Sequence, residues 1–227
     1  MRPIAERFSP AIRNLIVAQA VMFGLFIMAA GLRMPIQLHL ALGPLVAAGE
    51  IWQPITSLFV HLDWWGFVFD LIGIWFVGAT IEQALGRRRF LLLFFGTGLV
   101  ANLAVALVMA ALRWAGFYAG CGDAVLGLFV GLGVIYGRTQ VRVLGPLVLQ
   151  ARVLAALLVG LSVVGAISQA TWPGLVGTLV AVAAGYFLSG GKWTFISATL
   201  GRFRPRRRSV LEVLEGGRGK RGKKYVN

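Results

Sequence analysis

Long apolar runs, separated by short polar or basic segments, dominate the pattern of this chain. A helix needs roughly 20 residues to cross the hydrocarbon core of a bilayer, and six runs are close to that length. These runs cover residues 14–32, 65–86, 90–112, 121–138, 152–170 and 172–190. Because unpaired backbone polar groups are not tolerated in lipid, each run predicts a transmembrane helix. We therefore expect an all-α membrane protein built as one bundle of six transmembrane helices.

The polar stretches at the two ends divide the chain into three parts. We expect a cytoplasmic N-terminal segment at residues 1–13, a membrane domain at 14–191 and a basic cytoplasmic tail at 192–227. Residues 33–63 form a long connection on the outer side, rich in leucine and proline, which predicts a partly buried segment rather than a free loop. A connection of this length without structure of its own is uncommon unless it is functional.

The basic residues are distributed unequally between the two sides of the predicted membrane domain. The chain carries 22 lysines and arginines and a net charge of +14. With the N-terminus in the cytoplasm, all of them except Arg33 and Arg113 fall on the cytoplasmic side. This distribution follows the positive-inside rule, so we expect both termini in the cytoplasm and a location in a bacterial cytoplasmic membrane.

The basic tail raises the question of a charged partner. Arg202 to Arg208 form a juxtamembrane cluster, which is typical of segments that bind anionic lipid. Phe203 is the single aromatic residue among these charges, so nucleic acid is not the expected partner.

Small residues recur at helical spacing in the fourth and sixth runs. They are Gly122, Gly127, Gly131 and Gly133 in the fourth run and Gly174, Gly177, Ala181 and Gly185 in the sixth. Small residues let helix backbones approach closely in lipid, where packing drives association. We expect these two helices to touch.

A set of residues with specific spacing runs through the membrane domain. It comprises Trp52, Gln53, Thr56, Phe59, His61, Gly78, Glu82, Gly86, Gly120, Cys121, Gly122, Asp123, Gly127, Gly174, Gly177, Ala181 and Gly185. In these motifs the chain resembles the rhomboid family of intramembrane serine proteases, over nearly all of the six runs. The resemblance implies a laterally open bundle with a hydrated cleft in its outer half.

The resemblance does not extend to the catalytic residues of that family. Gly122 stands at the position that resembles the serine nucleophile and Gly174 at the position that resembles the histidine base. Gly66 and Asp70 stand where the family has a histidine and an asparagine that support the oxyanion. These changes predict a pseudoprotease and not an enzyme. The resemblance to inactive members of the family then implies that the protein binds transmembrane segments of client proteins, for regulation, trafficking or quality control.

Two acids within the predicted bundle suggest a different interpretation. Asp70 and Asp123 both lie in the outer half, and residues 120–123 match the Gly-x-Gly-Asp motif of intramembrane aspartyl proteases. Two carboxylates that share a proton can activate water without serine or histidine. The alternative is that each acid bonds backbone or water. A further interpretation is a structural homo-oligomer packed through the small residues of the fourth and sixth helices.

Cys121 and His61 are the remaining candidates for chemistry. Cys121 points about 100° away from its neighbour on a helix and has no evident base, which favours a packing role. His61 lies in the outer connection, where we expect it to brace the loop. We find no metal-ligand spacing and expect no cofactor.

Overall fold

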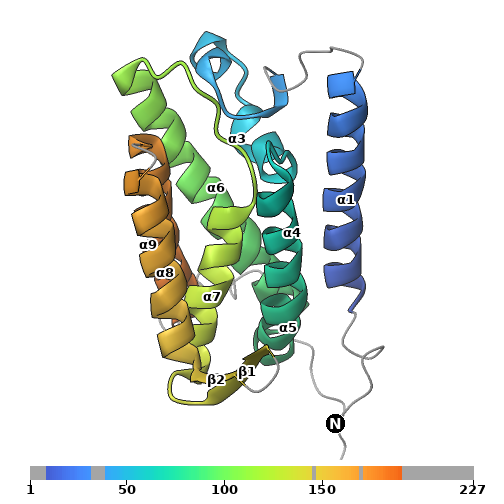
Figure 1. Ribbon diagram of the computed structural model, residues 1–227, viewed down its shortest axis with the longest axis vertical. Helices are drawn as coiled ribbons and strands as arrows, with labels where there is room; N and C mark the ends of the chain where they lie inside the picture. The colour runs from blue at the N-terminus through green and yellow to red at the C-terminus, as the bar shows by residue number, and fades with distance from the viewer. Residues whose placement is uncertain (1–8, 32–38, 145–146, 169–170, 191–227) are drawn as a thin grey trace, which may run out of the picture. The chain divides into compact units, whose positions relative to one another are not determined.

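The computed structural model of the chain describes residues 9–31, 39–144, 147–168 and 171–190. The chain divides into two units, and these residues all belong to the first, Met1–Trp193. In chain order the elements are α1 (Pro10–Gly31), η2 (Pro44–Ala48), α3 (Gln53–Thr56), η3 (Ser57–Phe59), α4 (Trp64–Gly73), η4 (Ile74–Gly78), α5 (Ala79–Leu85), α6 (Arg87–Leu112), α7 (Gly122–Tyr136), β1 (Gln140–Leu144), β2 (Leu147–Gln150), α8 (Ala151–Ser168) and α9 (Trp172–Ser189). Figure 1 shows their arrangement.

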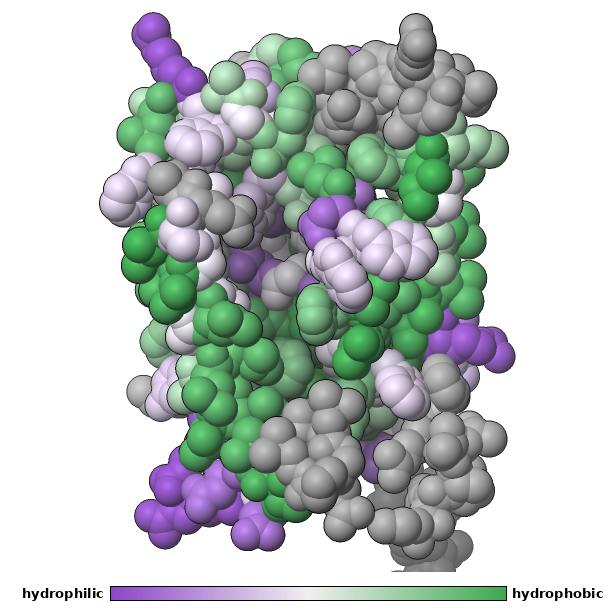
Figure 2. All heavy atoms as spheres, viewed as in Figure 1, coloured by the Kyte–Doolittle hydropathy of each residue, from purple (hydrophilic) through white to green (hydrophobic). Residues whose placement is uncertain are grey.

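The described part of the chain is a helical membrane bundle, as the sequence predicts. Five helical stretches are long and apolar enough to span a membrane, and α7 is a shorter apolar helix. All six coincide with the predicted runs. In Figure 2 apolar side chains cover much of the visible face, and hydrophilic residues lie inside a hollow in its upper half. The protein is an integral membrane protein, because helices of this length and composition are stable when their sides face lipid.

The predicted contact between the fourth and sixth helices is confirmed by the packing of α7 on α9. A Cβ atom built on Gly185 of α9 would lie 2.9 Å from the Cα of Gly127 and 3.0 Å from its carbonyl oxygen. A larger residue at Gly185 would therefore push the two backbones apart.

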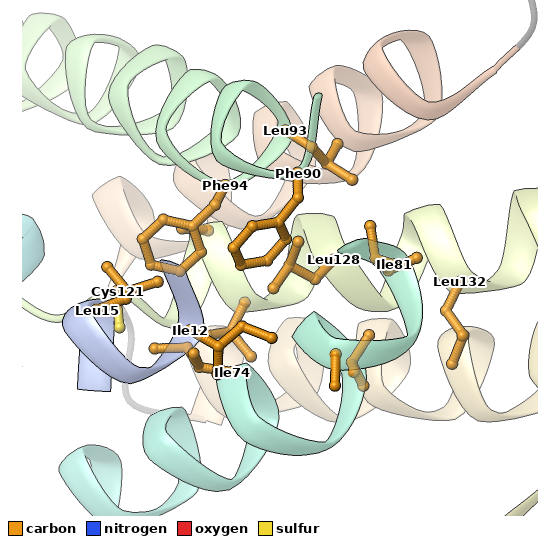
Figure 3. Packing of buried hydrophobic residues seen from close by; sticks show 14 of the residues in the cluster. Ile12, Leu15, Ile74, Ile81, Phe90, Leu93, Phe94, Cys121, Leu128 and Leu132 are labelled. Atoms are coloured by element: carbon orange, nitrogen blue, oxygen red, sulfur yellow. The ribbon is translucent and has the colours of Figure 1, made fainter. Parts of the chain in front are cut away.

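A buried apolar cluster joins α1, α5, α6 and α7. Figure 3 shows its largest side chains, among them Ile12 from α1, Ile81 from α5, Phe90 and Phe94 from α6 and Leu128 from α7. All five are fully buried. Cys121 lies at one end of the labelled group (Figure 3).

The N-terminal end of α1 is fixed to α5 through one polar contact. Ser9 accepts the N–H of Ile12 through its hydroxyl oxygen at 3.2 Å, which caps the helix, and donates its hydroxyl to Glu82. The first helix thus begins at Pro10, four residues before the predicted boundary of the membrane domain. Gly86 has φ +80° and separates α5 from α6, where the predicted motif glycine stands.

The connection before α4 is structured and partly buried, as predicted. Gln53 is fully buried, accepts the N–H of Gly43 at 2.9 Å and donates to Glu50 at 2.8 Å. Asn102 of α6 donates to the carbonyl of Pro54 and to the hydroxyl of Ser57, both at 2.9 Å. These bonds fix the connection on top of α6.

Trp52 and Thr56 attach the same connection to residues 39–40. The Trp52 indole donates to the carbonyl of His39 at 2.9 Å, and the Thr56 hydroxyl donates to the carbonyl of Leu40 at 2.8 Å. The motif residues Trp52, Gln53 and Thr56 therefore stabilise the connection by hydrogen bonds to other residues of the same connection.

One feature departs from the all-α expectation. After α7 the chain forms a hairpin of two antiparallel strands, β1 and β2, before α8 begins. The hairpin lies between two helices, beyond the apolar runs, so the bundle prediction itself is unaffected. The predictions for residues 1–8, Arg33 and the basic tail fall outside the described residues.

Candidate functional site

Two loop segments are tied together at one end of the bundle. The backbone N–H and C=O groups of Leu42 and Tyr118 pair reciprocally at 2.9 and 2.8 Å. The N–H of Gly120 donates to the carbonyl of Ser57 at 2.9 Å. These three bonds hold the segment that leads into α7 against the connection that contains His61.

Asp63 starts α4 and thereby sets the position of Asp70. Its side chain accepts the N–H of Gly66 at 2.6 Å, as an N-cap does. A Cβ atom on Gly66 would lie 2.7 Å from Asp63 Oδ2, so a larger residue at this position would displace the side chain of the N-cap residue. Asp70 follows on the second turn and is 9% exposed.

His61, Asp70 and Cys121 meet at this end of the bundle and form what we call the polar cluster. His61 Nε2 lies 3.0 Å from Asp70 Oδ2, and the thiol of Cys121 donates to the same oxygen at 3.3 Å. Cys121 Sγ and His61 Nε2 are 3.9 Å apart. Cys121 is fully buried and His61 is 2% exposed. Three groups capable of chemistry therefore converge at one buried point.

Asp70 also caps the helix that follows Cys121. The backbone N–H of Cys121, the N-cap residue of α7, donates to Asp70 Oδ2 at 3.1 Å. A carboxylate at a helix N-terminus is stabilised by the orphan N–H groups and the helix dipole. The expectation that this acid bonds to backbone is confirmed, but Asp70 has side-chain partners as well.

His61 is enclosed on its other side by aromatic rings. Its ring lies edge-on to Phe23 of α1 and Phe67 of α4, with centroid separations of 6.3 and 5.4 Å. Its Nδ1 atom is buried and has no hydrogen-bond partner among the described residues. The bond from His61 to Asp70 ties the outer connection to α4, which agrees with the bracing role predicted for His61.

Asp123 belongs to a second polar pair. Its Oδ2 atom accepts a hydrogen bond from the Tyr118 hydroxyl at 2.8 Å. Burial raises the pKa of Tyr118 well above its usual value, and the Asp123 carboxylate raises it further, so the phenol remains a donor. Asp70 and Asp123 therefore have different hydrogen-bond partners, which are His61 and Cys121 for the first acid and Tyr118 for the second. The carboxylate dyad of the aspartyl-protease interpretation stays a prediction.

The two glycines at the family's catalytic positions face different surroundings. A Cβ atom on Gly122 would lie 3.6 Å from Asp70 Oδ1, so this position borders the polar cluster. Gly174 lines a cavity of about 170 Å³ between the end of α6, the following loop and α9, together with Tyr118. A Cβ atom on Gly177 would lie 2.6 Å from Asp123 Oδ2, which places that motif glycine beside the second pair.

Sequence reasoning named every member of the polar cluster but did not join them. Cys121 packs in the buried apolar core, as expected, and its Sγ also lies 3.9 Å from Nε2 of His61, which comes from a loop 60 positions earlier. The sequence shows no metal-ligand spacing, but in the structure the three side chains offer ligand atoms within 4.8 Å of one another. The sequence signal for this cluster is the motif that runs from Trp52 to His61. This part of the chain forms the connection that Asn102 of α6 holds in place.

Fold and site together define a class: a helical integral membrane protein with a buried cluster of imidazole, carboxylate and thiol at one end of its bundle. A model of the Rhomboid domain matches residues 48–191, which include all three cluster residues and most of the bundle. The chain belongs to the rhomboid family.

Three curated relatives carry related names. The chain is 32% identical to the putative rhomboid protease YdcA of Bacillus subtilis over 84 residues, 37% of this chain and 41% of the relative. It is 32% identical to the rhomboid protease GluP of the same organism over 60 residues, 26% of this chain and 12% of the relative. It is 35% identical to the rhomboid-like protease 2 of Toxoplasma gondii over 65 residues, 29% of this chain and 23% of the relative. The chain thus matches less than half the length of each.

These names correct one prediction. The sequence predicted a protein that is not an enzyme, and this prediction is wrong because all three relatives are named proteases. The prediction rested on Gly122 and Gly174, which stand where the resemblance places a serine nucleophile and a histidine base. The structure brings three other reactive side chains to the same end of the bundle.

Proposed function

We propose that the protein is an intramembrane protease whose reaction centre is the polar cluster rather than a serine–histidine pair. The observation that carries this proposal is the meeting of His61, Asp70 and Cys121 at one buried point beside Gly122. Membership of the rhomboid family and the protease names of the relatives support it. The substrate would be a transmembrane segment of another membrane protein.

The surface of α4 supports access from the plane of the membrane. Trp65 and Phe69 are 69% and 66% exposed and lie on the same helix as Asp70. An apolar segment in lipid can therefore contact α4 without crossing a charged surface. The acid that it must reach lies one residue beyond Phe69, on the buried side of the helix.

The two oxygens of Asp70 have different surroundings, and this suggests a division of roles. Oδ2 accepts the bonds from the Cys121 backbone and thiol and lies against His61 Nε2. Oδ1 faces Gly122, at the position that resembles the family's nucleophile. A water molecule there could pass its proton to Oδ1 while its oxygen attacks the carbonyl carbon of the scissile bond, and that proton would then leave with the amine product.

His61 would act through its bond to Asp70. An imidazole bonded to a carboxylate holds that acid in position for proton transfer. Cys121 would hold the carboxylate in place by its two bonds. General acid–base catalysis by a positioned side chain contributes roughly 10²- to 10⁴-fold to a rate.

The proposal is tested with the full chain in lipid vesicles and a single-spanning reporter protein, whose fragments are identified by mass. We expect cleavage within the membrane segment, reduced roughly 10²- to 10⁴-fold by His61→Gln. The matched control is His39→Gln, because His39 is the other histidine of the chain and pairs with Glu50 at 2.7 Å in an exposed position. An intact reporter, or equal cleavage by the two histidine variants, would overturn the proposal.

A further inference from the structure

We propose that the polar cluster binds one divalent transition-metal ion of the zinc class, through His61 Nε2, an oxygen of Asp70 and Cys121 Sγ. The inference rests on the proposed function in one respect: the metal would activate the water at the same reaction centre. The binding itself can be measured without any substrate.

The spacing of the three ligand atoms fits a tetrahedral ion. Zinc bonds of about 2.0 Å to nitrogen and oxygen and about 2.3 Å to sulfur place tetrahedral ligand atoms roughly 3.3 to 3.5 Å apart. The observed separations are 3.0 Å from nitrogen to oxygen, 3.3 Å from oxygen to sulfur and 3.9 Å from sulfur to nitrogen. Shifts of a few tenths of an ångström would complete the geometry.

The donor set also fits in number and in charge. Imidazole, carboxylate and thiolate are the three ligand types that zinc takes in proteins, and catalytic sites keep a fourth position for water. Thiolate and carboxylate together carry two negative charges, which neutralise a dication, so the buried centre would be uncharged overall. Burying an uncompensated charge is costly, and this match avoids that cost.

The fourth position would face Gly122. A Cβ atom built there would lie 3.6 Å from Asp70 Oδ1 and 4.0 Å from Oδ2. Those are ordinary van der Waals separations, so we infer that the water ligand would lie on this side of the carboxylate. Metal-bound water is deprotonated far more readily than bulk water.

Binding has a defined proton balance. The Cys121 thiol becomes a thiolate and releases one proton to solvent, and His61 offers the Nε2 lone pair while its ring proton resides on Nδ1.

The test uses the purified full chain in nanodiscs of zwitterionic lipid, without a polyhistidine tag and after treatment with a chelator. Cobalt(II) alone is titrated as the probe, followed by competition with zinc(II). We expect one cobalt per chain, with a near-ultraviolet charge-transfer band from the thiolate. X-ray absorption should show one sulfur at about 2.3 Å and nitrogen or oxygen ligands at about 2.0 to 2.1 Å.

Variants separate this site from adventitious binding. Cys121→Ser should abolish the charge-transfer band, because Cys121 is the single cysteine of the chain. His61→Gln should lower the affinity at least tenfold, whereas His39→Gln should leave it unchanged. The thermal unfolding midpoint of each variant shows whether it is folded.

Each outcome bears on one proposal. Absence of stoichiometric cobalt, or a band unchanged in Cys121→Ser, would overturn the metal site. Stoichiometric metal without reporter cleavage would leave the site standing and remove the proposed protease function. Cleavage that persists fully in metal-stripped protein would leave the protease standing and overturn the proposed role of the metal in activating water.

Discussion

The first turn and the middle of α7 are held in place by different means. In the middle, Gly127 meets Gly185 of α9 backbone to backbone, with no room for a single additional carbon. At the start of α7, the N-cap residue Cys121 is held by hydrogen bonds to Asp70 of α4. A Cβ atom on the next residue, Gly122, would be in ordinary van der Waals contact with Asp70. One helix thus combines a tightly packed middle with a polar end.

This difference indicates where the molecule can support chemistry. A backbone contact fixes the distance between two helices but offers no reactive group. A side-chain network positions reactive groups and leaves space for a substrate atom or a water molecule. The tight middle of α7 therefore supplies the rigidity that the polar cluster at its end requires.

The largest expected effect separates the two acids at the polar end. Asp70→Asn should slow reporter cleavage roughly 10²- to 10⁴-fold, because the amide cannot accept a proton from water. Asp123→Asn should slow it less than about tenfold, since Asp123 bonds to Tyr118 and not to the cluster. Equal losses in the two variants, measured as initial rates in vesicles, would revive a dyad of these acids.

The next effect tests the tight middle. Gly185→Ala should lower the free energy of unfolding by about 1–3 kcal/mol, because its Cβ would meet backbone atoms of Gly127 that cannot rotate away. The matched control is Gly160→Ala on α8, where no atom lies within 4 Å of the new Cβ. Unfolding in mixed micelles gives the free energy of unfolding of both variants. An unchanged value for Gly185→Ala would show that α7 and α9 can move apart without a loss of stability.

A smaller effect compares two glycines near the acids. Gly177→Ala should cost about 1–2 kcal/mol, because its Cβ would lie 2.6 Å from Asp123 Oδ2 and 2.9 Å from Val105. Gly122→Ala should change stability by less than about 1 kcal/mol, since alanine is the better helix former and its Cβ would be in ordinary van der Waals contact with Asp70. Unfolding curves in the same micelles give both values, and a reversed order would contradict the described packing.

The smallest effect concerns the loop that carries His61. Asn102→Ala removes two bonds to the connection and should cost roughly 1 kcal/mol, since side-chain hydrogen bonds between membrane helices average about 0.6 kcal/mol each. Cleavage should fall by less than tenfold, because the Leu42–Tyr118 pairing still holds the loop. A complete loss of activity with unchanged stability would mean that Asn102 takes part in the reaction.

The sequence predicted the helices and the α7–α9 contact because both depend on local patterns. Apolar runs define spanning helices, and glycines four residues apart define a close-packing face. The hairpin of β1 and β2 lies between two apolar runs, where no such pattern applies.

The polar cluster could not be assembled from the sequence. Its members come from a loop, from the second turn of α4 and from the N-cap of α7, and no local periodicity connects such positions. The predicted orientation of Cys121 was that of a residue within a helix, where neighbouring side chains are about 100° apart. Its φ of −97° and ψ of 16° instead place it before the first turn of α7. Outside the helix, its side chain turns toward Asp70.

The central claim is that His61 and Asp70 act as one unit in catalysis, and a double-mutant cycle on reporter cleavage tests it most directly. When two residues act as a unit, removing the second has little further effect on the rate once the first is gone. The double variant His61→Gln with Asp70→Asn should therefore cleave about as slowly as the slower single variant. If the two losses multiply instead, or if neither change slows cleavage, the cluster is not the reaction centre.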